Sequence, residues 1–352
     1  MTKTELETLK ITPPDPAVYA KVKQNWDALA KPLDSMGEFE SLFARIGAIT
    51  SDETVPLQKK AVIAMCADNG IVEENISQSG QEVTARVAEA MGKGTSSVCR
   101  MAKRIGADVI PVDVGIATEE TIEGVLAKKV RRGTRNFLKE AAMTEEETLA
   151  AISIGIEVVK SCKEAGYNLL ATGEMGIGNT TTTSAVAAAM SGCPVEHITG
   201  KGAGLSDEGL LHKIEVIRQG IAKHKLEGAD TFTILSSVGG LDIAGLCGVY
   251  IGGALYHLPV VMDGVISIVA ALAAERLVPG TKEFVIPSHQ SREPAAELML
   301  KELGVKPLIH AGLALGEGTG AVLMFGMLDI VHGLYENKTT FQDIEVEPYT
   351  RF

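Results

Sequence analysis

Short apolar segments alternate with amphipathic ones along most of the chain, which predicts strands that alternate with helices. The apolar segments are rich in Val, Ile, Leu and Met without strict polar alternation, as is typical of strands buried on both faces. Each ends in small or polar residues: "AVIAMCADNG" from Ala61, "ADVIPVDVG" from Ala107, "NLLATGE" from Asn168, "FTILSSVGG" from Phe232, "PVVMDG" from Pro259 and "EFVIPSH" from Glu283.

The segments between them have helical periodicity, for example "EVTARVAEAMGKG", "LAAISIGIEVVKSCKEAG" and "LLHKIEVIRQGIAKHK". Strand, helix and strand at this spacing give right-handed crossovers and a parallel sheet. The sequence therefore predicts an α/β fold, a Rossmann-like parallel sheet of about six strands flanked by helices. Ligands of such sheets bind outside the carboxyl ends of the strands. We expect one crevice there, lined by Asp68, Asn69, Asp113, Gly173, Glu174, Ser237, Gly239, Asp263, Ser288 and His289.

Both ends of the chain are predicted to be helical. "DPAVYAKVKQNWDALAKPLDSMGEFESLFARIGAI" indicates two helices separated at "KPLDSMG", and "GAVLMFGMLDIVHGLYEN" indicates another near the C-terminus. We expect a small helical domain built from residues 1–55 plus 328–352, and a large α/β catalytic domain over residues 56–327.

Composition and charge narrow the class of protein. The 352 residues include 37 glycines and are 45% hydrophobic, which suits an α/β protein with tight turns between strands and helices. A net charge of −12 argues against a broad surface for nucleic acid or anionic membranes, but it allows a local cationic pocket. The most apolar region is interrupted by Asp242, His257, Pro259 and Asp263, so its pieces are shorter than the roughly 20 residues of a membrane span.

The N-terminus and the cysteines favour a cytoplasmic protein. "MTKTELETLKITPPDP" is charged from the start, unlike a signal peptide. The cysteines are five, an odd number, and none forms a CxxC pair, which predicts free thiols in a reducing compartment. They are Cys66, Cys99, Cys162, Cys193 and Cys247, of which the first and last are expected in the core.

The segment "GEMGIGNTTTTSAV", from Gly173, joins a predicted strand to a predicted helix. Glycines, hydroxyls and a helix N-terminus are the components of a phosphate-binding loop. It is not a Walker A loop, because no Lys-Ser/Thr follows the glycines, and its GxxGxG spacing is the reverse of the dinucleotide fingerprint. The alternative is a simple helix cap, with Asn179 or Thr180 as the N-cap residue.

Two further glycine-rich segments contain charged candidates. "GKGAGLSDEGLLHKIEVI", from Gly200, opens a helix with Lys201 and Lys213 nearby; a helical lysine is commonly a solvated charge, so by itself Lys213 is a weak ligand candidate. "LGEGTGAVL", from Leu315, places Glu317 between two glycines. Most loop glutamates are solvated, but small neighbours would leave this carboxylate accessible to a ligand.

Several of these segments together resemble one family, the nicotinate-nucleotide–dimethylbenzimidazole phosphoribosyltransferases. The resemblance runs from "KPLDSMG" to "GEGTGA", in the same order, and rests on "CADNGIVEENISQSGQEVT", "VDVGI", "GEMGIGNTTTTSAV", "VGGLDIAGLCG", "PVVMDG", "IPSHQSREP" and "LALGEGTGAVL". It implies transfer of phosphoribose from nicotinate mononucleotide to a benzimidazole nitrogen, which gives the α-ribazole phosphate of the cobamide lower loop and free nicotinate. It implies no cofactor, and the sequence shows no cluster of metal ligands.

The resemblance also assigns roles to residues. Glu317 matches the catalytic glutamate of the family and is expected to be the general base, while Glu174 orients the base or the ribose or steadies charge at the reacting carbon. Two carboxylates in one crevice should raise the pKa of at least one. The phosphate and ribose are expected to contact Gly176, Ile177, Gly178, Asn179, Thr180, Gly202, Lys213 and Ser291.

Two more residues of the crevice have less specific roles. Asp263 either contacts ribose hydroxyls or caps the helix that follows it, and the sequence leaves both open. His289 is interpreted as a hydrogen-bonded loop histidine rather than a proton shuttle.

The base pocket and the oligomeric state are the least constrained. The resemblance places Ser79, Gln81, Val87 and Leu315 around the base, with Gly80 where relatives often have proline and Val87 where some have glutamine. Substituted benzimidazoles, a purine or a phenol therefore all remain open. The family forms homodimers, and the small residues Gly245, Gly248, Gly252 and Gly253 allow either internal packing or a subunit interface, which we favour.

Two other functions fit parts of the sequence. A Rossmann-type NAD-dependent oxidoreductase would use the same sheet, but the reversed glycine spacing and the missing acidic residue after a true fingerprint argue against it. A non-catalytic nucleotide-binding protein would not need both Glu174 and Glu317.

Overall fold

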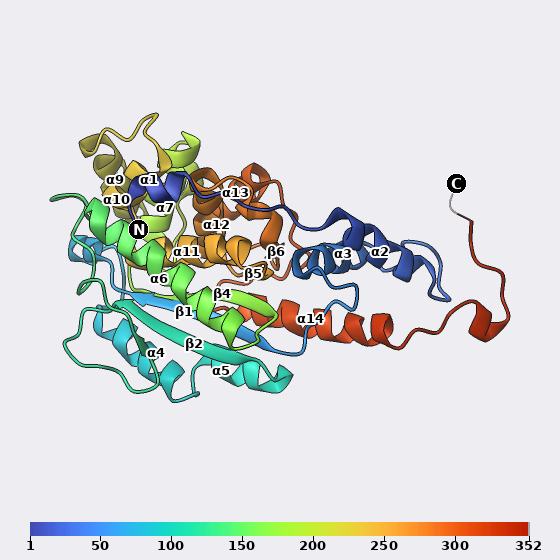
Figure 1. Cartoon of the computed structure of the whole chain (residues 1–352). Coiled ribbons are helices and arrows are strands. Elements are labelled where there is room, and N and C mark those ends of the chain that lie inside the picture. Colours follow the sequence, from blue (N-terminus) through green and yellow to red (C-terminus); the bar gives the residue numbers. More distant parts are fainter. Residues whose placement is uncertain (351–352) are drawn as a thin grey trace.

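A six-stranded parallel sheet runs through the centre of the molecule, with helices on both faces (Figure 1). The structure is a computed structural model that describes residues 1–350. The strand order is β3-β2-β1-β4-β5-β6, which is also the order of dinucleotide-binding Rossmann sheets. The strands are β1 (Lys60–Ala67), β2 (Asp108–Gly115), β3 (Leu126–Ala127), β4 (Leu169–Met175), β5 (Val260–Met262) and β6 (Val285–Pro287). The predicted fold class is thus confirmed.

The central strand β1 pairs with β2 on one side and β4 on the other, with Ala61 opposite Asp108 and Leu170. All eight of its residues are buried. Ile63 and Met65 face one hydrophobic core, while Val62 and Ala64 face a second core across the sheet. A strand that is apolar on both faces cannot show polar alternation, which explains its continuous apolar sequence.

Helices form a layer on each face of this sheet. The core that contains Ile63 is covered by α6 (Glu145–Glu164), α7 (Asn179–Ser191), α9 (Asp207–Lys223), α10 (Thr231–Val238), α11 (Leu241–Leu255), α12 (Val265–Leu277) and α13 (Ala295–Leu303). The opposite core is covered by α2 (Pro16–Asp27), α3 (Glu38–Thr50), α4 (Glu82–Gly92), α5 (Ser97–Ala102) and α14 (Thr319–Glu336). The remaining helices are short: α1 (Lys3–Glu7), α8 (Val195–Ile198), η1 (Gly70–Glu74), η2 (Lys103–Ile105), η3 (Thr281–Phe284) and η4 (Gln342–Ile344).

One predicted strand is wrong. The segment "FTILSSVGG" forms helix α10, because Asp230 caps its first turn: the Asp230 carboxylate accepts the Thr233 N–H at 3.0 Å and the Thr233 hydroxyl at 2.6 Å. This local capping outweighs the strand preference of the composition. The sixth strand is β3 instead, two exposed residues that are too short to give a sequence signal.

The glycines of α11 pack inside the molecule. A side chain at Gly248 would overlap the backbone of Ile152 and Gly155 on α6, and one at Gly252 would lie 2.9 Å from Val159. The interpretation of this stripe as a subunit interface is therefore wrong, because its small residues serve the close approach of α11 to α6.

Helices α2 and α3 lie beside the C-terminal helix α14 (Figure 1). The rings of Trp26 on α2 and Phe43 on α3 lie 5.5 Å apart, and both contact Tyr335 at the end of α14. The first helix, α1, is not part of this cluster, since Leu6 lies in the core on the α6 side of the sheet. The predicted helices at both ends are present, and the division into two domains stays a prediction.

The five cysteines are all unpaired, and Cys66 and Cys247 are fully buried, as expected of core residues. Burial raises the pKa of both of these thiols. Among residues 1–350, no helix combines the length and apolarity that crossing a membrane would need.

Candidate active site

A cavity of about 240 Å³ opens at the carboxyl ends of β4 and β5, where sheets of this topology bind ligands. We call it the Glu174 cavity. Its walls come from the loops that open α7, α9, α12 and α14. The predicted residues that line it are Glu174, Gly176, Ile177, Asn179, Thr180, Gly202, His289, Ser291, Leu315 and Glu317.

The first wall is the loop between β4 and α7. Gly178 caps this helix in a left-handed conformation (φ 92°), without any side-chain cap, so the alternative of Asn179 or Thr180 as N-cap is not what forms. The first N–H groups of a helix have no partner inside it and attract anions. Ile177 does not contribute in this way, because its N–H is donated to Thr84 Oγ1 at 3.1 Å.

Lys213 supplies a cation behind this loop. Its side chain is fully buried, and Nζ donates a hydrogen bond of 2.9 Å to Thr180 Oγ1. Among the described residues it forms no ion pair, and burial lowers its pKa to about 8, against a smaller opposing effect of Glu293. A buried, unpaired ammonium is costly unless an anion joins it. The surroundings of Lys213 therefore fit a phosphate group.

The second wall is the loop that opens α14. Gly316, Glu317 and Gly318 all have positive φ, at 87°, 61° and 97°. This conformation is easy for glycine but unfavourable for glutamate, and such strain persists only where the surrounding structure fixes it. The loop thus turns Glu317 toward the cavity at a conformational cost.

Asp263, at the end of β5, fixes that loop. Its carboxylate accepts the N–H groups of Gly318, Gly320 and Ala321 at 3.1, 2.9 and 3.1 Å. It is 2% exposed, and burial raises its pKa to about 6. The expected cap of α12 does not form, because Gly264 is the N-cap residue of that helix and Asp263 caps α14 instead. The contact of Asp263 with ribose hydroxyls stays a prediction.

The two glutamates of the cavity have different environments. Glu317 Oε2 accepts the Val98 N–H at 3.0 Å, a backbone donor in the first turn of α5. Glu174 is buried and accepts a hydrogen bond from the Asn179 amide. Burial, followed by repulsion from Asp242, raises the pKa of Glu174 to about 8, with smaller contributions from Asp263 and Glu317. Glu174 consequently carries a proton near neutral pH, as expected for one of two neighbouring carboxylates.

The residues expected around the base are only partly brought together. Leu315 lines the Glu174 cavity and is 59% exposed. Gln81 donates its amide to the Asn69 carbonyl at 3.3 Å and lines a separate hollow of about 540 Å³. Ser79 donates its N–H to Ser77 Oγ, and Val87 on α4 packs against the core on the α14 side of the sheet. Among the described residues, these three do not line the Glu174 cavity.

Several other residues of the expected crevice lie elsewhere. Ser237 and Gly239 end helix α10, since their segment is not a strand. Asp68 lines the 540 Å³ hollow, and Asp113 pairs with Lys129 at 3.2 Å. His289 is buried beside the Ser288 hydroxyl, and burial lowers its pKa to about 4, so it is neutral and fits the expected role of a loop histidine.

Sequence reasoning missed the buried carboxylate of Asp242. This residue, in the first turn of α11, is fully buried, and burial raises its pKa to about 6. Its neighbours Gly239 and Gly240 mark a tight entry into a helix, which could have indicated that the aspartate points inward. In the sequence it stands out only as an interruption of an apolar region.

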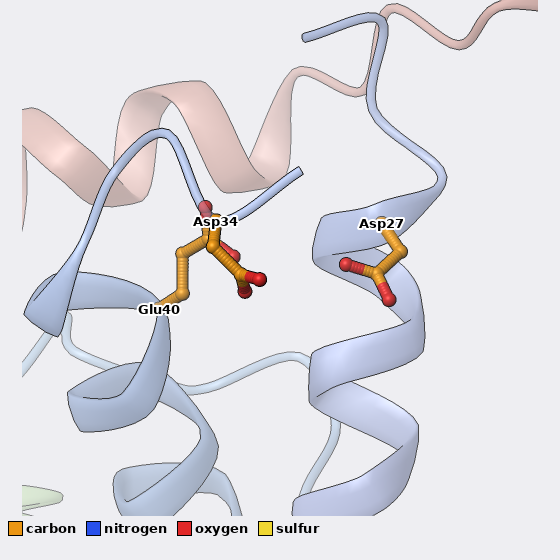
Figure 2. A group of neighbouring side chains, drawn as sticks. All are labelled: Asp27, Asp34 and Glu40. Carbon is orange, nitrogen blue, oxygen red and sulfur yellow. The ribbon is translucent and has the colours of Figure 1, made fainter. Parts of the chain in front are cut away.

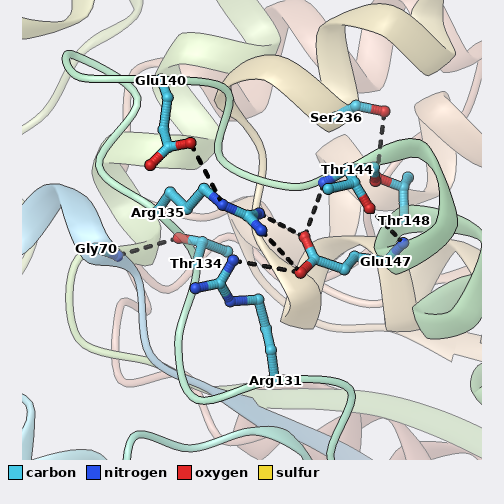
Figure 3. Close-up of polar contacts among 9 residues, drawn as sticks. All are labelled: Gly70, Arg131, Thr134, Arg135, Glu140, Thr144, Glu147, Thr148 and Ser236. Carbon is cyan, nitrogen blue, oxygen red and sulfur yellow. Dashed lines mark hydrogen bonds and ion pairs between the residues drawn. The ribbon is translucent and has the colours of Figure 1, made fainter.

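Polar contacts fix the segment 131–144 against helix α6 and the turn after β1 (Figure 3). Arg135 binds the Glu147 carboxylate through two hydrogen bonds, of 2.6 and 3.1 Å, and Arg131 adds one of 3.3 Å. Thr134 Oγ1 accepts the Gly70 N–H at 3.0 Å. Paired bonds between a guanidinium and a carboxylate fix geometry well, so this segment anchors the turn that follows β1.

One group of three carboxylates lies close enough to consider a metal ion: Asp27, Asp34 and Glu40, on and between α2 and α3 (Figure 2). Two lysines already occupy two of its carboxylates. Lys31 binds Glu40 at 2.7 Å, and Lys23 binds Asp34 at 3.0 Å. We therefore assign no metal to this acidic group.

Comparison with known proteins gives a consistent result. A family model described as phosphoribosyltransferase matches residues 11–346. The nicotinate-nucleotide–dimethylbenzimidazole phosphoribosyltransferase of Clostridium acetobutylicum is 44% identical over 95% of both chains, and that of Geobacter sp. strain M21 is 40% identical over 96% of this chain and 97% of its own. The crystal structure of CobT from Thermus thermophilus superposes with a TM-score of 0.89 at 35% identity, over 95% of this chain and 100% of its own. The chain thus belongs to the nicotinate-nucleotide–dimethylbenzimidazole phosphoribosyltransferase family of pentosyl-transferring enzymes.

Proposed function

We propose that this protein transfers 5-phosphoribose from nicotinate mononucleotide to a benzimidazole-type base. The products are free nicotinate and α-ribazole phosphate, which supplies the lower loop of a cobamide. The observation that carries the proposal is the pairing of two sites in one cavity. The buried cation of Lys213 and the N-terminus of α7 suit the phosphate. Glu317 and Glu174 line the cavity, and we place the reacting ribose carbon beside them.

The reaction needs little beyond these groups. The bond between the ribose C1 and the nicotinate nitrogen breaks, and its electron pair stays on the ring nitrogen, so no acid is needed to expel the leaving group. One ring nitrogen of the azole forms the new bond to C1, and the other nitrogen loses its proton. A single general base completes the balance.

Glu317 is the proposed base. The left-handed turn between two glycines directs its carboxylate into the cavity, and the hydrogen bond from the Val98 N–H fixes the position of Oε2. Glu174, protonated near neutral pH, can donate a hydrogen bond to the azole or to the ribose. The two carboxylates would then act in different protonation states, because their environments differ.

The proposed acceptor follows from the cavity and from the relatives. Leu315 offers an apolar surface in the cavity, and dimethylbenzimidazole is the default acceptor because the relatives are named for it. Ser79, Gln81 and Val87 would contact the base only after α4 and the segment before it had moved toward the cavity. Substituted benzimidazoles, a purine and a phenol are therefore all included in the test below.

We propose that the protein is a cytoplasmic enzyme and that it forms a homodimer. Helix α14 exposes Leu323, Ile330 and Leu334 at 41%, 79% and 43%. Their spacing places them along one face of the helix, and an apolar face of this kind is typical of subunit contacts. Ile330→Glu should convert the dimer to a monomer in light scattering, whereas a mass that does not change would exclude this face.

The decisive experiment follows nicotinate release from nicotinate mononucleotide. The purified protein is incubated with dimethylbenzimidazole, other benzimidazoles, adenine or a phenol, and the products are separated by chromatography. Release that depends on an added base supports the transfer, and the best acceptor identifies the natural class of base. Release without an acceptor would indicate a hydrolase, and no release with any acceptor would refute the proposal.

A further inference from the structure

One carboxylate on the wall of the Glu174 cavity has no hydrogen-bond donor. Glu293 lines the cavity and is half-buried, in the loop between β6 and α13. Its backbone N–H donates to Ser291 Oγ at 3.4 Å, but its carboxylate has no hydrogen bond or ion pair within residues 1–350. A carboxylate in a ligand cavity is an acceptor, so this one is available for hydroxyl or N–H groups of a ligand.

The other carboxylates in and behind the cavity already have donors. Glu174 accepts a hydrogen bond from a side-chain amide, and Glu317 accepts one from a backbone N–H at 3.0 Å. Asp263 accepts three backbone N–H groups and is not among the described residues that line the cavity. Glu293 is therefore the acceptor in this cavity that the protein itself leaves open.

Backbone hydrogen bonds hold Glu293 from both sides. The N–H of the preceding residue, Arg292, donates to the Leu313 carbonyl at 3.1 Å, and Leu313 belongs to the segment that leads to Glu317. On the other side, the Ala296 N–H donates to the Glu293 carbonyl at 3.0 Å, in the first turn of α13. The position of Glu293 is thus tied to the segment that carries the proposed base.

The loop before α9 meets the carboxylate of Glu293 across the cavity wall. A side chain at Gly200 would overlap Glu293 Oε2, so glycine leaves this oxygen its space. Two residues further, a side chain at Gly202 would lie 3.4 Å from Lys213 Nζ. One short loop thus has the carboxylate beside one glycine and the buried ammonium beside the next. The two charges form no ion pair within the described residues, although Glu293 opposes the lowering of the Lys213 pKa.

A carboxylate so close to the proposed phosphate site has a cost. Its charge repels a bound phosphate, because charges that are partly buried are only weakly screened. The repulsion is offset if the same ligand donates hydrogen bonds to the carboxylate. Ribose 5-phosphate groups can do so, since the 2- and 3-hydroxyls of the ring lie between the carbon that carries the phosphate arm and the anomeric carbon. A carboxylate has two oxygens, and each can accept one of these hydroxyls.

We propose that Glu293 determines the sugar specificity of the cavity: its carboxylate accepts the 2- and 3-hydroxyls of the ribose, with the phosphate at Lys213 and the anomeric carbon toward Glu317. The inference rests on the proposed function for the identity of the ligand, a 5-phosphoribosyl compound. A 2-deoxyribosyl ligand would leave one carboxylate oxygen without a donor, beside a phosphate. A site built to bind a hydroxyl rejects the analogue that lacks it, so the cavity should prefer ribose.

Binding of simple sugar phosphates tests the assignment without turnover. The full-length protein is titrated by calorimetry with ribose 5-phosphate, 2-deoxyribose 5-phosphate and inorganic phosphate. It should bind ribose 5-phosphate about tenfold more tightly than the deoxy compound, as expected for one hydrogen bond to a charged acceptor. In Glu293→Ala this preference should disappear, whereas inorganic phosphate should bind at least as tightly as before, because a nearby negative charge is gone.

Glu297→Ala is the matched control. It removes a carboxylate from the exposed first turn of α13, close in the chain but not on the wall of the cavity, and it should keep the preference for ribose. A purely structural role of Glu293 would weaken the binding of all three ligands equally, and that result would overturn the proposal. Glu293→Gln keeps the size of the side chain and replaces Glu293→Ala if that variant does not fold.

Three other results would also overturn the proposal. The first is a preference for ribose that persists in Glu293→Ala. The second is an unsubstituted protein that does not bind ribose 5-phosphate or does not distinguish it from the deoxy compound. The third is a preference that is lost in Asp263→Asn but kept in Glu293→Ala, which would assign the hydroxyls to Asp263. If nicotinate is never released, the proposed function fails, but the preference for ribose still decides the role of Glu293.

Discussion

Helices α7 and α14 begin in the same way but serve opposite purposes. Each follows a glycine-rich loop, and each has a left-handed glycine as its N-cap, Gly178 (φ 92°) and Gly318 (φ 97°). Neither has a side-chain cap from its own N-cap residue. Their sequences, "GIGNTTTT" and "GEGTGAVL", would both be interpreted as anion-binding turns.

The difference lies in what meets the exposed N–H groups. At α14 the Asp263 carboxylate binds three of them, so the protein itself supplies the anion. At α7 no carboxylate among residues 1–350 accepts the first N–H groups: those of Asn179 and Thr181 bond to the carbonyls of Gly176 and Gly178 at 3.1 and 2.9 Å, and Lys213 contacts the Thr180 hydroxyl. The N-terminus of α14 is therefore satisfied by an internal carboxylate, which fixes the loop that carries Glu317, whereas the N-terminus of α7, beside Lys213, is the proposed phosphate site. A glycine-rich turn identifies a helix start, and its neighbours decide whether it binds a ligand.

The largest effect should come from Glu317→Gln, which keeps the shape of the side chain but cannot accept the azole proton. We expect kcat to fall about 10³-fold, within the usual contribution of a general base, while the affinity for nicotinate mononucleotide, measured by calorimetry, stays the same. Glu336→Gln, at the exposed end of the same helix, is the control and should be fully active. Normal turnover of Glu317→Gln would exclude it as the base.

Asp263→Ala tests the internally satisfied helix start. The variant leaves three N–H groups without their acceptor, and we expect the free energy of unfolding to fall by about 3 kcal/mol in urea denaturation. Asp230→Ala removes the cap of α10, which is more exposed, and should cost only about 1 kcal/mol. If the two substitutions cost the same, Asp263 is an ordinary cap, and the rigidity of the Glu317 loop has another source.

The sequence predicted most of the fold because its strongest patterns are local. Five of the six apolar segments are strands, and the terminal helices begin and end close to the expected positions. The failure at "FTILSSVGG" has a local cause, the Asp230 cap, which the apolar composition concealed. β3 could not be predicted, since a strand of two exposed residues depends on its neighbour β2 for its existence.

The sequence predicted site residues that have a local signal, but not the hydrogen bonds between residues far apart in the chain. The glycines around Glu317 indicated an accessible carboxylate, and the cavity contains it. Asp263 accepts the N–H of Gly318, which lies 55 positions further along the chain. Thr84 accepts the N–H of Ile177, which lies 93 positions away. Contacts over such separations leave no local sequence pattern. For Lys213 a signal did exist: it shares the apolar face of α9 with Ile214 and Ile217, which indicates burial.

Lys213→Ala tests the helix start that is left for a ligand. Removal of the buried cation should raise KM for nicotinate mononucleotide about 30-fold with a smaller change in kcat, as expected for the loss of one charged hydrogen bond of about 2 kcal/mol. The free energy of unfolding should not fall in proportion, because an unpaired buried ammonium does not stabilise the empty protein. An unchanged KM would remove Lys213 from the phosphate site.

The affinity for nicotinate mononucleotide should depend on pH through the charge of Lys213. Burial lowers the pKa of Lys213 to about 8, so its positive charge is present below this pH and is lost above it. We expect the dissociation constant, measured by calorimetry in Glu174→Gln to remove the other group that titrates there, to rise above pH 8. In Lys213→Arg the guanidinium stays charged, and the rise should disappear if the arginine fits. A constant affinity across this range would show that the ammonium does not contact the phosphate.

The smallest expected effect is the difference in stability between alanine substitutions at the two N-cap glycines, Gly178 and Gly318. Alanine at Gly178 must adopt a left-handed conformation, which costs about 1 kcal/mol, and its Cβ would lie 2.8 Å from the Val72 side chain, which lies at the edge of the core. Alanine at Gly318 has the same backbone cost, but its Cβ would lie 2.6 Å from Val62, a central residue of β1 with no space to move, and 3.1 Å from the Thr172 carbonyl oxygen. Thermal unfolding should therefore rank Gly318→Ala below Gly178→Ala in stability. Equal melting temperatures would mean that only the backbone conformation of the cap matters, and that the packing of Asp263 and β1 around α14 does not set the two helix starts apart.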